Sequence, residues 1–249
     1  MICCAYLRDE DNIQIIPLEE SARGLSMTPT VCQASISFPL KDLAFAQQLH
    51  ESAHQCLPEI AGIIRKHGLE NDVVIRLLHT HFPLEGGDAL VHRWHDNAFE
   101  TRPGRVPEGA VGCTFTPSRA DPGRLDVIEY VAPGSDRSVI LADRVLAIRD
   151  FVEEASAVLA QNGMSTLYGF GTRFYADQLD SDDDLILVEC NDFTERRSET
   201  SAVDRCLLDG QSWTETSWRV VGDQLVVESA CITSGAMVCE RRPPPPLAM

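Results

Sequence analysis

Short strand-like runs dominate the hydrophobic pattern of this chain, and the turns that join many of them are too short to hold a crossover helix. The pattern predicts strands over residues 72–82, 89–95, 111–116, 125–131, 166–174, 185–190, 214–221 and 224–232. Strands with short connections pair antiparallel, because a parallel pair needs a crossover of a dozen residues or more. Gly222-Asp223 between the last two runs predicts a β-hairpin.

Two segments carry apolar side chains at helical spacing. In residues 42–67 these side chains recur three and four positions apart, and Pro58 should kink that helix or split it in two. Residues 141–159 form a second stripe, which should end at Asn162-Gly163. Two long amphipathic helices beside many strands predict an α+β fold, with a largely antiparallel sheet packed against both helices.

The chain is long enough for one large hydrophobic core, with 249 residues of which 44% are hydrophobic. We expect a single α+β domain over residues 1–240 and a flexible, proline-rich tail over residues 241–249. Residues 97–109 and 191–211 lack apolar alternation and should be irregular. The first of these segments is predicted to be a loop long enough to cover a pocket.

An excess of acidic residues limits the partners of the chain. The formal net charge is −17, from 38 acidic and 21 basic residues, so nucleic acid and anionic membranes are unfavourable partners. The N-terminus lacks the cationic start and apolar run of a secretory signal. Nine cysteines without C-x-x-C spacing predict mostly reduced, buried thiols. These features predict a cytoplasmic protein, and they leave its oligomeric state open.

Four of the seven histidines fall in one short stretch, at His79, His81, His92 and His95. Imidazole titrates near neutrality and is a good metal ligand, so this excess is the clearest indication of chemistry in the chain. Side chains two apart on a strand share a face, so His79 and His81 should point together into a cleft. A turn at residues 85–88 would place the other two on an adjacent antiparallel strand.

Three interpretations of these histidines stay open. They are hydrogen-bonded or solvated side chains without a chemical role. Alternatively, His79 and His81 bind zinc, iron or copper together with His95 or Glu85. In the third interpretation no metal is bound, and one imidazole acts as general acid or base while Arg76, Arg93 or Glu85 stabilises charge on a small molecule.

The box R-L-L-H-T-H-F-P-L at residues 76–84 resembles one in small, mostly uncharacterised proteins of filamentous fungi, whose pattern is L-L-H-x-H-F before an acidic turn and another strand. Here Glu85 and Asp88 lie in the turn. Such proteins often end in a Cys/His-rich segment, whereas this chain has Cys231 and Cys239 followed by arginines and prolines. Some are encoded beside natural-product pathways, so the resemblance implies a role on a specialised metabolite.

We therefore expect a biosynthetic enzyme of specialised metabolism that acts on a small apolar organic substrate in an apolar pocket. A cofactor-free cyclisation, isomerisation or elimination, cycloaddition included, needs shape and an acid–base pair. No nucleotide or flavin fingerprint is visible. The expected catalytic residues are His79, His81, Arg76 and Glu85, and the expected substrate-binding residues are His92, Trp94, His95, Tyr168 and Arg173. The alternative is a metal-binding protein, with His79, His81 and His95 as ligands of zinc, iron or copper, or a non-enzymatic interaction module.

Overall fold

The computed structural model of the chain describes residues 40–95, 98–118, 121, 124–133, 148–173, 179 and 184–232. All of them belong to one compact unit, residues 34–249. The start of the expected domain and the expected proline-rich tail lie outside the described residues, so the bounds of the domain stay a prediction.

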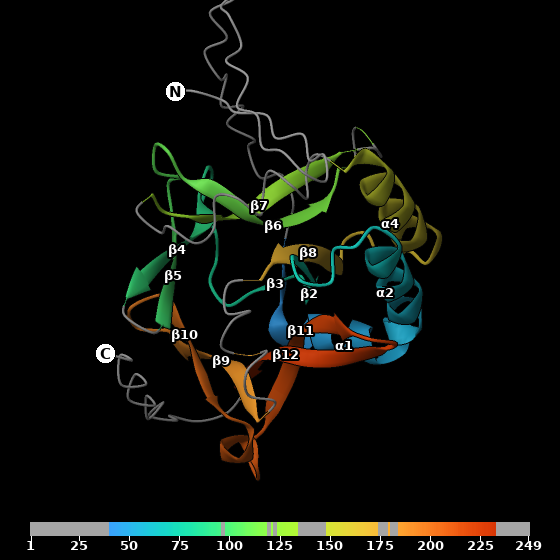
Figure 1. Cartoon of the computed structure of the whole chain (residues 1–249). Coiled ribbons are helices and arrows are strands. Elements are labelled where there is room, and N and C mark those ends of the chain that lie inside the picture. Colours follow the sequence, from blue (N-terminus) through green and yellow to red (C-terminus); the bar gives the residue numbers. More distant parts are fainter. Residues whose placement is uncertain are drawn as a thin grey trace, which may run out of the picture. The chain divides into compact units, whose positions relative to one another are not determined.

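β-strands are the commonest element among the described residues. The strands are β1 (Lys41–Asp42), β2 (Val73–Leu77), β3 (His79–Thr80), β4 (Ala89–His95), β5 (Ala98–Gly104), β6 (Val111–Pro117), β7 (Leu125–Val131), β8 (Tyr168–Thr172), β9 (Leu185–Asp192), β10 (Arg197–Asp204), β11 (Trp213–Val221) and β12 (Gln224–Ile232). Ten of them form a closed barrel in the order β10-β5-β4-β7-β6-β8-β2-β11-β12-β9 (Figure 1). Neighbours in the barrel pair antiparallel, except β4 with β7 and β12 with β9, which are parallel. β1 and β3 form a separate two-stranded ladder.

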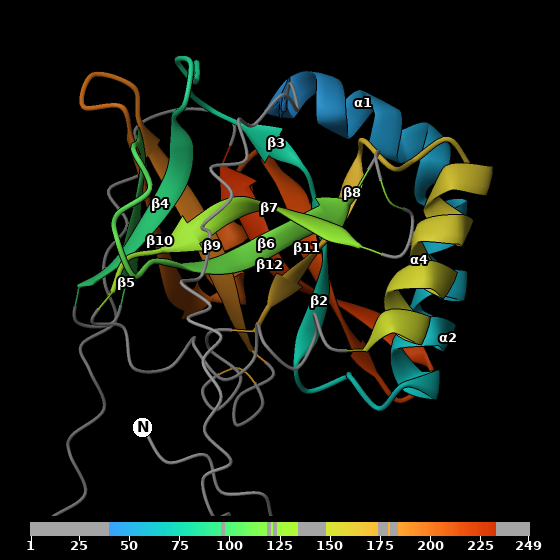
Figure 2. The same ribbon diagram turned by 90° about the horizontal axis from the view of Figure 1, so that it is seen from above.

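Three helices lie on one side of the barrel (Figures 1 and 2). The first helical segment is α1 (Leu43–Ala53), a 3-10 turn η1 (His54–Cys56) and α2 (Leu57–Lys66). Pro58 occupies the first turn of α2, where a missing N–H is tolerated, so the expected split is confirmed. The second segment is α4 (Arg149–Gln161), and residues 141–147 of its expected range lie outside the described residues. Among the described helices, none combines the length and apolar composition needed to cross a membrane.

The α+β fold expected from the sequence, a sheet packed against two long helices, is wrong, because the sheet closes on itself. β5 and β10 make the closure, and they lie in the two segments that were expected to be irregular. They pair with each other and connect β4 to β9. Their inward side chains include Thr101, Ser198 and Thr200, which line a cavity. Hydroxyl side chains give no apolar alternation, and the sequence pattern therefore missed both strands.

The largest apolar core lies between the helices and the strands that they cover. Ile60 and Ile64 of α2 and Phe151 of α4 are fully buried in it. The Phe151 ring packs edge-on against Phe170 of β8, with 5.2 Å between ring centroids. Side chains alternate along a strand, so the glycines that flank Phe170 face the barrel interior. The apolar core therefore lies outside the barrel wall and leaves the interior to other side chains.

Close packing inside the barrel gives a test of the fold at Gly169. A Cβ atom there would collide with the Phe115 carbonyl oxygen, which is backbone and cannot move aside. We expect Gly169→Ala to lower the free energy of unfolding by about 1–3 kcal/mol, measured in urea. Gly62→Ala in α2 is the control, since a Cβ there has nothing within 4 Å, and it should stabilise by about 0.5–1 kcal/mol. A Gly169→Ala variant as stable as wild type would contradict this packing.

Candidate metal centre

The barrel encloses a cavity of about 50 Å³. A cavity of this size holds a few water-sized groups, each of which needs about 10–15 Å³ on this measure. Ionisable side chains and hydroxyls make up much of its wall. The ionisable residues in the wall are Arg76, His79, His81, His92, Glu129 and Glu189, and the hydroxyl residues are Thr80, Thr101, Thr114, Ser198, Thr200, Thr216 and Ser229.

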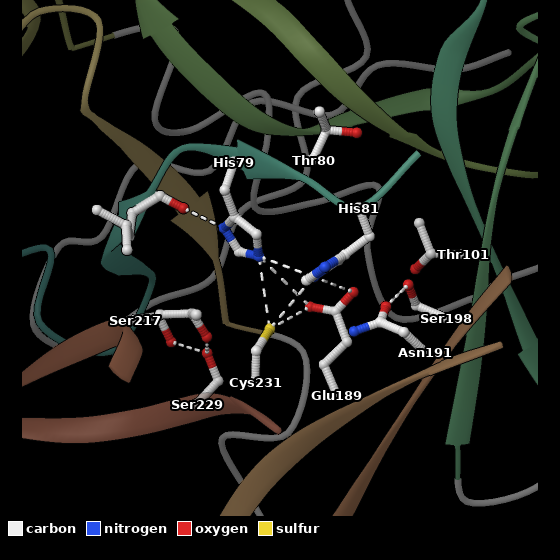
Figure 3. Close-up of polar contacts among 12 residues, drawn as sticks. His79, Thr80, His81, Thr101, Glu189, Asn191, Ser198, Ser217, Ser229 and Cys231 are labelled. Atoms are coloured by element: carbon white, nitrogen blue, oxygen red, sulfur yellow. Dashed lines mark hydrogen bonds and ion pairs between the residues drawn. The ribbon is translucent and has the colours of Figure 1, made fainter. Parts of the chain in front are cut away.

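Four side chains converge at this cavity, and Figure 3 shows them pointing toward one another. His79 Nε2 lies 3.1 Å from His81 Nε2 and 3.4 Å from Cys231 Sγ. His81 Nε2 lies 3.5 Å from the same sulfur. Glu189 completes the group, because its Oε1 is 3.4 Å from His81 Nε2 and its Oε2 is 2.9 Å from Cys231 Sγ and 3.8 Å from His79 Nε2. We call these four residues the His–Glu–Cys cluster.

Two features of the fold bring the cluster together. After Leu77 the chain leaves the barrel ladder and continues into β3, and His79 in β3 and His81 directly after it, two positions apart, put both imidazoles on one side. β9 and β12 are parallel neighbours, and their register sets Cys231 directly beside Glu189. The cluster therefore joins three segments that are far apart in the sequence.

A backbone hydrogen bond fixes the tautomer of His79. Its Nδ1 lies 2.8 Å from the Leu77 carbonyl oxygen, which only accepts, so Nδ1 carries the proton and Nε2 presents a lone pair to the cluster. Burial, and then the neighbouring His81 ring, lower the pKa of His79 and keep the ring neutral near pH 7. Metal-binding histidines usually have an outer hydrogen bond of this kind.

His81, Glu189 and Cys231 shift one another's pKa values. Burial alone would lower the pKa of His81, but the Glu189 carboxylate raises it. Burial alone would raise the pKa of Glu189, but the two imidazoles hold it well below its usual value. Burial and the same carboxylate raise the pKa of the Cys231 thiol, which donates its hydrogen bond to Glu189. A cation would have to displace these protons, as metal ions do at such sites.

The spacing of the ligand atoms is close to that of a tetrahedral metal site. Zinc bonds of about 2.0–2.1 Å to nitrogen and oxygen and about 2.3 Å to sulfur place neighbouring ligand atoms about 3.3–3.6 Å apart. The distances that involve the imidazole nitrogens, the sulfur and Glu189 Oε1 are 3.1, 3.4, 3.4 and 3.5 Å. The distance between the two imidazole nitrogens, 3.1 Å, is slightly below that range, and the two distances to Glu189 Oε2, 2.9 and 3.8 Å, lie on either side of it. A metal ion would need the Glu189 carboxylate to rotate so that one oxygen serves as the ligand.

A second group in the barrel, His92, Cys113 and Glu129, also brings metal-ligating atoms together. Its contacts favour an ion pair. Glu129 Oε2 is 3.4 Å from His92 Nε2 and 3.4 Å from Arg76 Nη1, and it accepts a hydrogen bond from Thr114. A dication here would lie beside the fixed positive charge of the guanidinium, which is unfavourable.

The charges of this pair follow from its neighbours. Burial would lower the pKa of His92, but the Cys113 sulfur and the Glu129 carboxylate raise it to about 10. Burial would raise the pKa of Glu129, but His92 and Arg76 lower it to about 2. At neutral pH His92 is therefore an imidazolium without a free lone pair, and Glu129 is its counter-ion.

Four of the residues that were expected to form the site lie in the wall of the cavity. Arg76, His79, His81 and His92 all line it. The hairpin expected between the histidine-bearing strands is wrong, because β4 pairs with β5 and β7. His92 consequently faces Glu129, and the His79–His81 pair finds its partners on β9 and β12.

Two other expected residues, Glu85 and Trp94, do not contribute to the cavity wall, and a third, His95, has no described side chain. Glu85 is exposed at the turn, 3.8 Å from Arg196. Trp94 packs against the Phe99 ring, with 5.5 Å between centroids. The side chain of His95 lies outside the described residues, so its role as a metal ligand stays a prediction.

Tyr168 and Arg173 have partners away from the cavity. The Tyr168 side chain is buried, and its hydroxyl is 2.8 Å from Nδ1 of His50 on α1. Arg173 is buried as well, and its Nε donates to Glu228 Oε2 at 2.9 Å. Both residues therefore serve the packing of the barrel wall in this structure.

Sequence reasoning missed Glu189, Cys231 and Glu129. Glu189 had a usable indication, because a carboxylate two positions after Leu187 shares the inward face of an apolar strand and must find a partner there. Cys231 had none, since it lies 150 residues from His81 along the chain.

Comparison of the chain with protein-family models, with curated proteins and with solved structures finds no match. The resemblance to the fungal L-L-H-x-H-F proteins stays a prediction. The function is therefore inferred from the geometry of the barrel interior.

The ion pair predicts how stability changes with pH. The pKa of His92 is about 10 in the fold against 6.5 for a free ring, so its contribution is complete below pH 6.5 and is lost as the pH rises through 10. We expect the stability advantage of wild type over His92→Gln to shrink by a few kcal/mol over that range, on the order of what the shift implies. Urea unfolding at several pH values measures it. His54→Gln, at an exposed position, is the control, and a constant advantage would contradict the ion pair.

Proposed function

We propose that this protein binds one divalent transition-metal ion, zinc in the first place, through the His–Glu–Cys cluster inside its barrel. The observation that carries the proposal is the convergence of four metal-ligating side chains from three separate segments, with one ligand atom of each within 4.8 Å of the others. Imidazole, thiolate and carboxylate together suit zinc, and copper or iron accept parts of the same set. The neutral tautomer of His79 supports the proposal, because it leaves Nε2 ready to bind without losing a proton.

The position of the cluster supports a role in chemistry as well as in stability. His79, His81 and Glu189 line the cavity, so a bound ion would face it. Among the cluster side chains Glu189 is the most exposed, at 21%, and its displacement would open a coordination position toward the cavity. A metal with an open position polarises a bound molecule or activates a bound water.

Catalysis on a small molecule is the second candidate function. The hydrogen-bonded His92–Glu129 pair lines the same cavity and supports it, because such a pair can transfer protons to a bound substrate. The cofactor-free cyclisation, isomerisation or elimination expected from the sequence stays a prediction. A cavity of about 50 Å³ holds a few heavy atoms, so a substrate of natural-product size requires the barrel to open.

We also propose that the protein is cytoplasmic. The thiols of Cys56, Cys113 and Cys231 are free, which a reducing compartment preserves. The disulfide bond at Cys190 argues in the other direction. Imaging of a fluorescently tagged chain tests the location, and a signal in the secretory pathway would contradict it.

Elemental analysis tests the metal proposal. Full-length protein purified without chelator should contain about one zinc per chain, and a His79→Ala/His81→Ala double variant should contain none, because a site with two ligands left binds far more weakly. His54→Ala removes an exposed imidazole and is the matched control. Zinc at about 100 times its dissociation constant should stabilise the metal-free protein by about 2.7 kcal/mol. Metal-free wild type that zinc does not stabilise, or a double variant that retains the metal, would contradict the proposal.

A further inference from the structure

The Arg76 side chain extends from β2 into the cavity and passes over Gly171 of the neighbouring strand β8. A Cβ atom at Gly171 of β8 would collide with Nε and Cδ of Arg76, so only glycine leaves room for this side chain. The Arg76 side chain is 21% exposed and lines the same cavity as the His–Glu–Cys cluster. The fold thus makes space for a guanidinium in the barrel interior.

The guanidinium has more donors than its surroundings use. Within the part of the chain that the structure describes, Arg76 makes one hydrogen bond, from Nη1 to Glu129 Oε2 at 3.4 Å. That oxygen is shared with His92 and Thr114. Nε of Arg76 is buried without a partner. Arginine has five N–H donors in a planar fork that matches a carboxylate, and the Nη donors that Glu129 does not accept are available to a guest.

Arg76 places a permanent positive charge in the cavity wall. Apart from the His–Glu–Cys cluster, the charged residues that line the cavity are Arg76, His92 and Glu129. The Arg76 guanidinium is positively charged at any physiological pH, and the Glu129 oxygen that it contacts is shared with His92 and Thr114. A small anion is therefore the guest that complements this side of the wall.

We infer that the cavity binds a small monoanion, a carboxylate or similar oxyanion of about five heavy atoms or fewer, between the bound metal and the Arg76 guanidinium. The inference rests on the proposed metal function and names the class of molecule that the metal acts on. Arg76 orients one end of the anion through the guanidinium fork, and the metal takes the other end. Hydroxyls such as those of Thr101 and Thr200 in the same wall supply further neutral hydrogen bonds.

The test uses the full chain loaded with Co(II), whose visible spectrum reports its ligands. Acetate is the probe, and acetamide is the neutral control of the same size. We expect acetate to change the spectrum saturably and to bind at least about tenfold more tightly than acetamide, because only acetate pairs with the guanidinium. Arg76→Met should weaken acetate binding by about tenfold or more while the protein still binds one Co(II). Arg93→Met, at an exposed position of β4, should leave it unchanged.

The outcomes separate this inference from the proposed function. A chain that binds no Co(II) overturns both. A chain that binds Co(II) but binds acetate no better than acetamide overturns the anion inference alone, as does an Arg76→Met variant with wild-type affinity. If circular dichroism shows that Arg76→Met does not fold, Arg76→Lys replaces it, because lysine keeps the charge beside Glu129 but lacks the fork. That variant should bind acetate several times more weakly, and unchanged affinity overturns the inference.

Discussion

Burial of carboxylates inside a closed barrel is the constraint on which this structure depends. A buried carboxylate is unfavourable by several kcal/mol unless other groups compensate its charge. Glu189 meets two imidazoles and a thiol, and Glu129 meets a guanidinium and an imidazolium. Glu228 meets Arg173 at 2.9 Å. Each carboxylate is paired with residues from other segments of the chain, so these contacts also tie different parts of the barrel together.

The fold was predictable where strands carry apolar side chains, and it was not predictable where they do not. β4, β7 and β12 begin and end at the residues that the hydrophobic pattern predicts. β5 and β10 escaped that pattern because inward residues such as Thr101, Ser198 and Thr200 line a polar cavity. Without these two strands the sheet has no way to close, and an open sheet against two helices is the natural but wrong interpretation. The polar inward residues that form the cavity are therefore also the reason why the sequence pattern did not predict the barrel.

The candidate site was predictable in part for a similar reason. Spacing along one strand is a local property, and it was sufficient to place His79 and His81 on one face beside a cavity. Cys231 and Glu189 join them through a parallel pairing of β9 with β12, which no local pattern encodes. His92 lies close in sequence to the first two histidines, yet strand order gives it a different partner. Residues far apart in sequence thus complete the cluster, and the barrel topology decides which ones.

A metal ion at the His–Glu–Cys cluster would account for the four converging side chains as its ligands. The cavity beside it, which Arg76 lines, would then be the place where a small molecule binds. Zinc K-edge X-ray absorption of the purified full chain measures that coordination directly. We predict two imidazole nitrogens and one oxygen at about 2.0–2.1 Å and a single sulfur at about 2.3 Å. A coordination shell of nitrogen and oxygen alone, without sulfur, would contradict the assignment of Cys231 and with it the proposed metal centre.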